Sequence, residues 1–155
     1  MGWDGNASET DQLAMLETVA KQRLAEADGA EPVYLPYVPQ VGDKTAPLDL
    51  QEAADYYLTH SGQHPNAVNK MLLQSASHII AFTGFDRVEK LLTQPLLVIA
   101  GSEAGSLWHS EKLYSMAPGP KELFIIDGAT HMDLYDGKGA DLAMAKLTPF
   151  YKDNL

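Results

Sequence analysis

Two side chains with complementary chemistry follow two apolar runs in the C-terminal part of the sequence. The run LLVIA, residues 96–100, is followed by a loop that contains Glu103, and the run ELFIID, residues 122–127, is followed by a loop that contains His131. If the two runs are neighbouring parallel strands, both side chains lie at the carboxyl edge of the sheet, where open α/β sheets bind their ligands. A carboxylate beside an imidazole can orient it as a general base. The spacing therefore leaves two interpretations of His131 open: a base that Glu103 orients, or an ordinary exposed loop histidine.

The elements that carry these loops predict a parallel βαβα arrangement. The run at 96–100 has no polar alternation, which is typical of a strand buried on both faces of a parallel sheet. A helix is expected over 106–116, the second strand over 122–127, and a last helix over about 139–152, kinked or shortened by Pro149. The crossover between the two strands is right-handed by default.

A helix is also expected near the N-terminus, over residues 8–27, where apolar residues recur at helical spacing. Either Ser8 with Asp11 or Asn6 with Glu9 can form a capping box, in which each side chain bonds the backbone N–H of the other residue. The sequence leaves both pairs open.

The middle of the chain predicts a proline-rich connection and two more helices. Four prolines between residues 31 and 49 favour extended chain, with a short edge strand around 33–35. A short helix is expected over 48–59. A longer amphipathic helix is expected over 66–80, because apolar and small residues recur there at helical spacing. These residues are Val68, Met71, Leu72, Ser75, Ala76, Ile79 and Ile80.

The stretch PLLVIAGSEAGSLWHSEKLY, followed by KELFIIDGATHMDLYD, is similar to the C-terminal half of the α/β-hydrolase superfamily. It looks closest to bacterial hydrolases grouped near the dienelactone hydrolases, and the likeness covers roughly residues 60–150. The resemblance implies an α/β fold class: a partial α/β-hydrolase fold with a short parallel sheet of the last two strands, flanked by helices, plus lid or cap helices. In this family the loop after the last strand carries the catalytic histidine, which corresponds to His131.

The resemblance also implies a domain organisation. We expect one partial domain over residues 1–155, with helical cap and connecting segments over 1–80 and the C-terminal βαβα unit over 81–155.

The serine nucleophile of the family is missing from the sequence. Its motif G-x-S-x-G precedes the acid and the histidine in the chain, so it is expected upstream of residue 1. The family places an aspartate in the loop after the first of the two strands, where this sequence has Ala104 and Gly105. Glu103 is the nearest carboxylate, and Asp86 is another candidate because some hydrolases carry the acid on a different strand end.

Several of these residues also have structural interpretations. Glu103 can simply stabilise the N-terminus of the following helix, and Ser102 and Ser106 are most simply a turn residue and an N-cap. The motif HSGQH at 60–64 places two histidines four residues apart, but its glycine and the following Pro65 favour a loop. We expect no metal and no cofactor.

The composition restricts the partners of the protein. The 155 residues have a formal net charge of −10 and include no cysteine. The negative charge argues against nucleic acid and against anionic membrane surfaces, and the absence of cysteine fits a reducing, cytoplasmic location. The resemblance implies a small-molecule ester-type substrate for the complete protein.

Two strands alone do not make a stable sheet, so the run at 96–100 is expected to need another neighbour. Residues 33–35 could add a third strand, or the chain could form a homo-oligomer or associate with a missing N-terminal half. Three functions remain open: a serine hydrolase acting on an ester, lactone or thioester, a non-catalytic half-domain that associates with itself or a partner, and a small α/β binding module.

Overall fold

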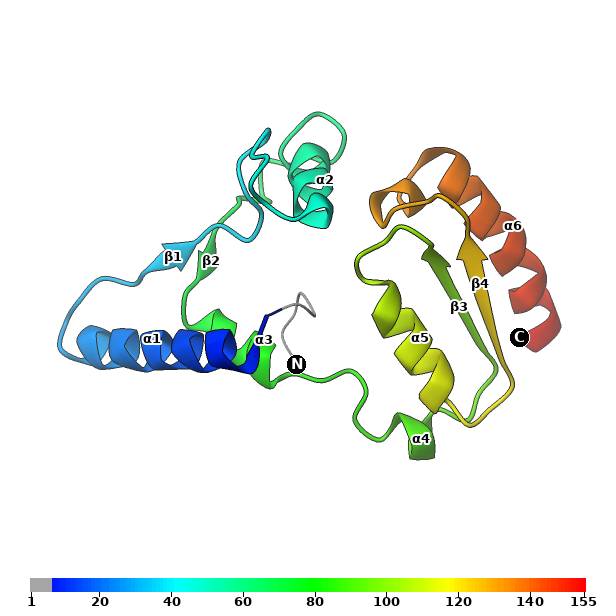
Figure 1. The fold of residues 1–155 in the computed structure, drawn as a ribbon, viewed down its shortest axis with the longest axis horizontal. Coiled ribbons are helices and arrows are strands. Elements are labelled where there is room, and N and C mark those ends of the chain that lie inside the picture. The colour runs from blue at the N-terminus through cyan, green and yellow to red at the C-terminus, as the bar shows by residue number, and fades with distance from the viewer. Residues whose placement is uncertain (1–6) are drawn as a thin grey trace.

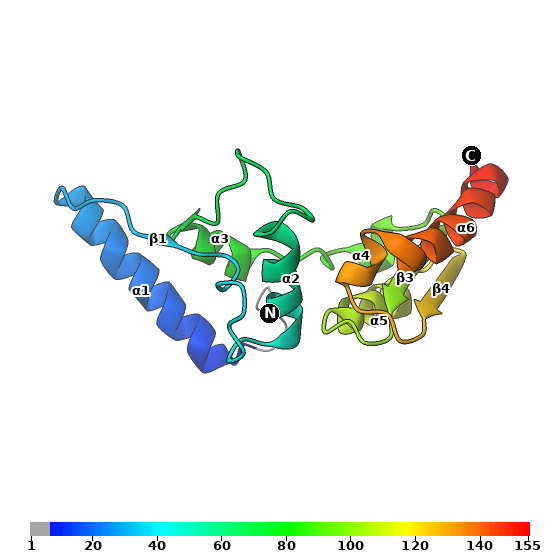
Figure 2. The same ribbon diagram turned by 90° about the horizontal axis from the view of Figure 1, so that it is seen from above.

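The computed structural model describes residues 7–155, which form two groups of elements joined by an extended connection (Figures 1 and 2). The first group contains α1 (Glu9–Ala27), β1 (Tyr34–Leu35), α2 (Leu48–Tyr57), β2 (Met71–Leu72) and α3 (Ser75–Ala81). The second contains α4 (Val88–Leu91), β3 (Leu96–Gly101), α5 (Leu107–Met116), β4 (Lys121–Ile126), the 3-10 helix η1 (Met132–Leu134) and α6 (Gly137–Asn154). Within residues 7–155, none of the helices has both the length and the apolar character needed to cross a bilayer.

The second group is built on the predicted parallel pair of strands. β3 and β4 pair in parallel, with Leu96 opposite Lys121 and Gly101 opposite Ile126. α5 connects the two strands, and α5 and α6 pack on the two faces of the sheet (Figure 1). The apolar side chains of Val98 and Ile126 are buried by this packing. The mixed α/β class and the short parallel sheet are therefore as predicted.

The N-terminal helix begins with one of the two expected capping boxes. The Asp11 N–H donates to Ser8 Oγ at 3.1 Å, and the Ser8 N–H donates to the Asp11 carboxylate at 3.3 Å. The alternative pair involves Asn6, which lies outside the described residues. A capping box satisfies N–H groups that the first turn of a helix leaves without partners.

The expected strand near residue 34 exists but does not extend the main sheet. β1 pairs with β2 in a separate two-stranded antiparallel sheet, with Tyr34 opposite Leu72. The possibility that residues 33–35 add a third strand beside 96–100 is therefore wrong.

The long helix expected over 66–80 is wrong in its first half. Residues 71 and 72 form β2, and only Ser75–Ala81 is helical. The reason is tertiary: the Asn69 side chain accepts hydrogen bonds from the N–H groups of Tyr37 and Val38 and donates to the Val38 carbonyl. These bonds hold the segment against the proline-rich connection, where its backbone pairs with β1 instead of with itself. Val68, which belonged to the predicted apolar stripe, is 63% exposed.

The last helix is longer than expected because Pro149 does not end it. α6 continues from Gly137 through Pro149 to Asn154. A proline inside a helix frees the carbonyl four residues earlier, here that of Ala145. Both residues are exposed, so water can satisfy the freed carbonyl.

A small apolar cluster between α2 and the proline-rich connection reaches across to the second group of elements. Its buried members are Val38, Ala53 and Ala54, and Met132 of η1 packs against them. This contact brings α2 beside the segment that follows His131.

Candidate acid–base site

The loops that follow β3 and β4 are joined by hydrogen bonds from backbone N–H groups at the carboxyl edge of the sheet. The Glu103 N–H donates to the Ala129 carbonyl at 2.9 Å, and the Gly128 N–H donates to Ser102 Oγ at 2.8 Å. Gly128 turns the chain after β4 with a φ of +70°, which glycine adopts without steric cost. The expected meeting of the two loops is thus observed, and it positions His131 three residues after the turn.

Gly101, the last residue of β3, allows these loops to approach closely. A Cβ atom at this position would lie 2.1 Å from the Ala129 carbonyl oxygen and 2.8 Å from that of Thr130. Both oxygens belong to backbone, which cannot move aside as a flexible side chain can. A glycine is therefore needed here for space.

Both ring nitrogens of His131 have hydrogen-bond partners. Nδ1 lies 3.2 Å from Ser106 Oγ, and Nε2 lies 3.3 Å from the hydroxyl of Tyr135. Tyr135 follows the single turn of η1, so it returns to the same side as His131, and the two rings meet edge to face. These two hydrogen bonds orient the imidazole. Because His131 is exposed, the ring also remains accessible.

Glu103 is in the same loop region, but its carboxylate does not pair with the imidazole within residues 7–155. Its Oε1 accepts a hydrogen bond from the neighbouring Ser102 hydroxyl at 3.4 Å. The other candidate acid, Asp86, is exposed before α4 and contacts Arg87. The role of Glu103 as the orienting acid stays a prediction.

Ser106 is the partner of His131 that sequence reasoning missed. It is the N-cap residue of α5, as expected, but its side chain makes no cap hydrogen bond. Instead its hydroxyl points to His131, 25 residues later in the chain. The predicted sheet topology could have indicated this contact, because loops at the carboxyl ends of neighbouring parallel strands lie at one edge.

Tyr135 connects the imidazole to α2. The Tyr57 hydroxyl donates to the Tyr135 hydroxyl at 3.1 Å, and the rings of Tyr56, Tyr57 and Tyr135 meet edge to face. The hydrogen bond with Tyr135, together with partial burial, raises the pKa of Tyr57 to about 12. The Tyr57 hydroxyl therefore stays protonated at neutral pH and holds Tyr135 through a hydrogen bond.

A cavity of about 340 Å³ lies beside these residues. It is lined by the end of β3, by the start of α5 and by the residues around His131, including Ser106, His109, Ser110 and Tyr135. Its volume is within the usual range of small-molecule sites. The arrangement can hold a small ligand against an oriented imidazole.

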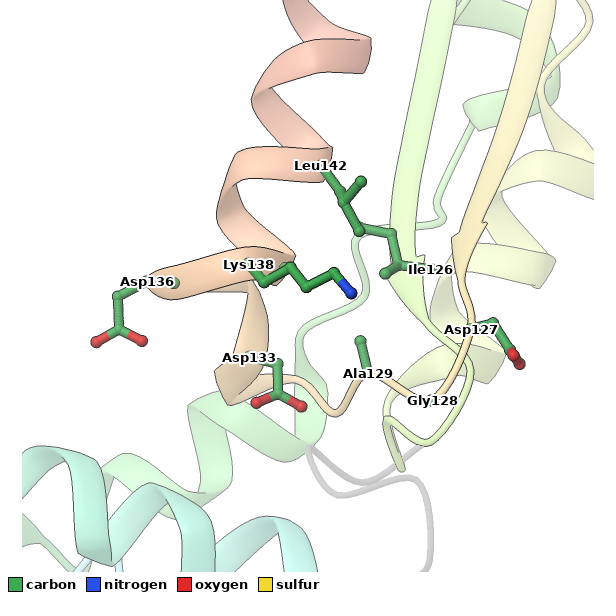
Figure 3. Close-up of a pocket in the computed structure, with 10 residues that line it drawn as sticks. Ile126, Asp127, Gly128, Ala129, Asp133, Asp136, Lys138 and Leu142 are labelled. Atoms are coloured by element: carbon green, nitrogen blue, oxygen red, sulfur yellow. The ribbon is translucent and has the colours of Figure 1, made fainter.

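A second hollow of about 330 Å³ lies between the end of β4 and the start of α6. Figure 3 shows the Lys138 side chain reaching across it toward Ile126 and Ala129, while the carboxylates of Asp127 and Asp136 point away. His131 does not line it. In the described part of the chain, no three histidine or acidic side chains are grouped so that they could hold a metal ion.

The sequence is similar to that of several known proteins over nearly its whole length. The chain is 35% identical to an uncharacterised Escherichia coli protein, YcjY, over 99% of this chain and 51% of that protein. It is 23% identical to the polyketide transferase af380 of Aspergillus fumigatus over 95% of this chain and 51% of that protein. No family model matches.

Solved structures identify the fold. The crystal structure of the hypothetical protein PA2218 of Pseudomonas aeruginosa matches with a TM-score of 0.83 and 28% identity, over 97% of this chain and 47% of that one. The α/β-hydrolase GrgF of Penicillium matches with a TM-score of 0.68 and 23% identity, over 95% and 51%. The chain is half of an α/β-hydrolase-like fold. The chain spans about half the length of the relatives it matches. The matched region includes β3 and β4.

Proposed function

We propose that this chain is the histidine-bearing half of an acyl-transfer protein of the α/β-hydrolase type, which cleaves an ester, lactone or thioester. The observation that carries the proposal is the position of His131. Its imidazole follows β4 at the carboxyl edge of the parallel sheet, has both nitrogens hydrogen-bonded, and faces a cavity of suitable size. The proposal includes a relationship to the dienelactone hydrolases.

In the proposed reaction His131 acts first as a base and then as an acid. Nε2 takes the proton of a nucleophilic hydroxyl while the oxygen of that hydroxyl bonds to the acyl carbon. The proton then passes to the leaving alcohol or thiol as its bond to the acyl carbon breaks. Water repeats the sequence and releases the acid. The likeness to a protein named polyketide transferase supports a variant in which an acceptor hydroxyl replaces water.

The nucleophile has to come from sequence outside this chain. Ser102 lies in the turn after β3 and bonds Glu103, and Ser106 lies at the start of α5 and faces Nδ1 rather than Nε2. Neither lies at the sharp strand-to-helix turn that exposes a nucleophilic serine. We therefore expect no labelling of the isolated chain by a fluorophosphonate probe.

A chimera tests the proposal directly. The part of PA2218 that this chain does not match would be joined to this chain, and hydrolysis of p-nitrophenyl esters and of a simple thioester would be measured. We expect turnover in the chimera and a loss of about 10³-fold or more when His131 is replaced by alanine. The matched control is His78→Ala, because His78 lies in α3 within the first group of elements. A folded, ester-active chimera that keeps its rate without His131 would refute the proposal.

A second function is favoured by the sheet. Within residues 7–155, β3 pairs with β4 only, so its outer edge has no strand partner. Unpaired strand edges bind further strands. In this alternative the chain is non-catalytic and associates through β3 with a second copy or with the other half of the fold. Light scattering after size exclusion tests it: a stable monomer of 16.9 kDa would contradict self-association.

A further inference from the structure

A carboxylate from α2 occupies the space that a side chain at position 105 would fill. Asp49 lies in the first turn of α2, 56 residues before Gly105, and its Oδ1 accepts a hydrogen bond from the Gly105 N–H at 3.1 Å. A Cβ atom at position 105 would lie 2.0 Å from Asp49 Oδ2 and 2.8 Å from Asp49 Cγ. Any side chain at this position would displace the carboxylate.

Gly105 leaves room for the Asp49 side chain, and its backbone conformation does not itself require glycine. Its φ lies outside the left-handed region that favours glycine, and the Asp49 side chain supplies the three nearest atoms to the missing Cβ. The segment that carries Ser106 therefore has a carboxylate beside it, and this carboxylate is supplied by a distant helix.

The bound segment leads directly to the imidazole. Gly105 precedes Ser106, whose hydroxyl lies 3.2 Å from His131 Nδ1. Glu103, the acid expected from the sequence, bonds Ser102 instead. We propose that Asp49 is the positioning acid of this site and replaces the missing loop carboxylate by holding the 105–106 segment against His131. This inference rests on the proposed function of His131 as the base.

The physical effect would be to select one tautomer of the imidazole. A carboxylate that accepts from a backbone N–H makes a charge-assisted hydrogen bond, which is stronger than a neutral one. It fixes the segment so that Ser106 Oγ can accept from Nδ1–H. Nε2 is then left without a proton, as a general base requires. At the other end of α2, Tyr57 holds Tyr135 beside Nε2. The same helix therefore contacts the segment of Ser106 at one end and Tyr135 at the other.

Nitrogen NMR of the ¹⁵N-labelled 155-residue chain tests the inference without requiring catalysis. At a pH where His131 is neutral, we expect the Nδ1–H tautomer to dominate in the wild-type chain. Asp49→Ala should bring the two ring-nitrogen shifts toward a common average. The double variant Asp49→Ala with Gly105→Asp puts a carboxylate into the same space from the loop, and it should restore the separation of the shifts.

Two further variants keep the test decisive. Asp55→Ala removes an exposed acid of the same helix and should leave the His131 shifts unchanged. Asp49→Asn keeps the shape and the acceptor oxygen, so it tests the charge if Asp49→Ala does not fold. Wild-type shifts in a folded Asp49→Ala or Asp49→Asn chain would overturn the proposal. So would a folded double variant that behaves like Asp49→Ala.

The same variants in the PA2218 chimera separate this inference from the proposed function. Asp49→Ala should lower kcat about 100-fold with little change in KM, as expected when a catalytic group is misplaced by about 1 Å, and the double variant should recover activity. A chimera that needs His131 but not Asp49 would refute the positioning role alone. An ester-active chimera that does not need His131 would refute the proposed function, while the NMR result would still decide whether Asp49 orients the ring.

Discussion

Replacing Gly101 with alanine should push the histidine loop away from the end of β3. The added Cβ would lie 2.1 Å from the Ala129 carbonyl oxygen, whereas real Cβ atoms essentially never approach within 3.0 Å of another atom. Because the carbonyl oxygens of Ala129 and Thr130 both belong to backbone in a close-packed region, the loop must move by about 1 Å. This movement also stretches the hydrogen bond between the Glu103 N–H and the Ala129 carbonyl.

The size of the effect follows from this overlap. Overpacking of this kind costs about 1–3 kcal/mol of the free energy of unfolding. In a chain of this length, such a loss lowers the melting temperature by about 2–12 °C. Thermal unfolding followed by circular dichroism measures the change. The ring resonances of His131 should shift in the same variant, because the contact of Nδ1 with Ser106 depends on the position of the loop.

Gly84→Ala is the matched control for this substitution. A Cβ at position 84 would meet a single side-chain atom at 3.9 Å, which is ordinary contact, and its φ lies outside the left-handed region. This variant should unfold at the wild-type temperature or slightly above it. If Gly101→Ala and Gly84→Ala unfold at the same temperature and leave the His131 resonances alike, the packing argument is refuted.

Three other predictions concern the surroundings of the site and the first group of elements. Because the pKa of Tyr57 is raised from 10.0 to about 12, its contact with Tyr135 stabilises the fold below pH 10 and this contribution is lost as pH rises toward 12. Absorbance titration should show this late ionisation, and Tyr135→Phe should bring it nearer to 10; an unchanged titration would contradict the assignment. Asn69→Ala removes three hydrogen bonds to the backbone of residues 37–38 and should cost about 2 kcal/mol or more in urea unfolding, with Asn69→Asp, which keeps the acceptor, losing less. Ser8→Ala should cost about 1 kcal/mol and Ser8→Thr, which keeps the hydroxyl that bonds Asp11, much less, and equal losses would argue against the capping box.

The elements that depend on local pattern could be predicted from the sequence. The Ser8 capping box, one of the two that the sequence allowed, and the unbroken apolar run of β3 are signals that need no distant partner, and both are observed. The βαβα order then brought the loops of Glu103 and His131 to one edge, which the structure also shows. This much of the site follows from sheet topology.

What the sequence did not predict depends on contacts between distant segments. The stripe over 66–80 has helical spacing, but the bonds of Asn69 and the pairing of β1 with β2 favour extended chain over half of it. The link from Asp49 to Gly105 joins residues 56 positions apart. A glycine that leaves room for a carboxylate from another helix has the same one-letter code as a glycine in a turn, so only coordinates reveal it.

The parallel pairing of β3 with β4 also sets a delay during synthesis. β3 ends at Gly101 and its partner ends at Ile126, so 25 further residues must be made before the pair can close. At ribosomal rates of about 5–20 residues per second, this takes about 1–5 s. Throughout that interval the run LLVIA is a fully synthesised apolar segment with neither its strand partner nor α6 to cover it. During this interval the β4-pairing edge of β3 is open to chaperones and to other nascent chains.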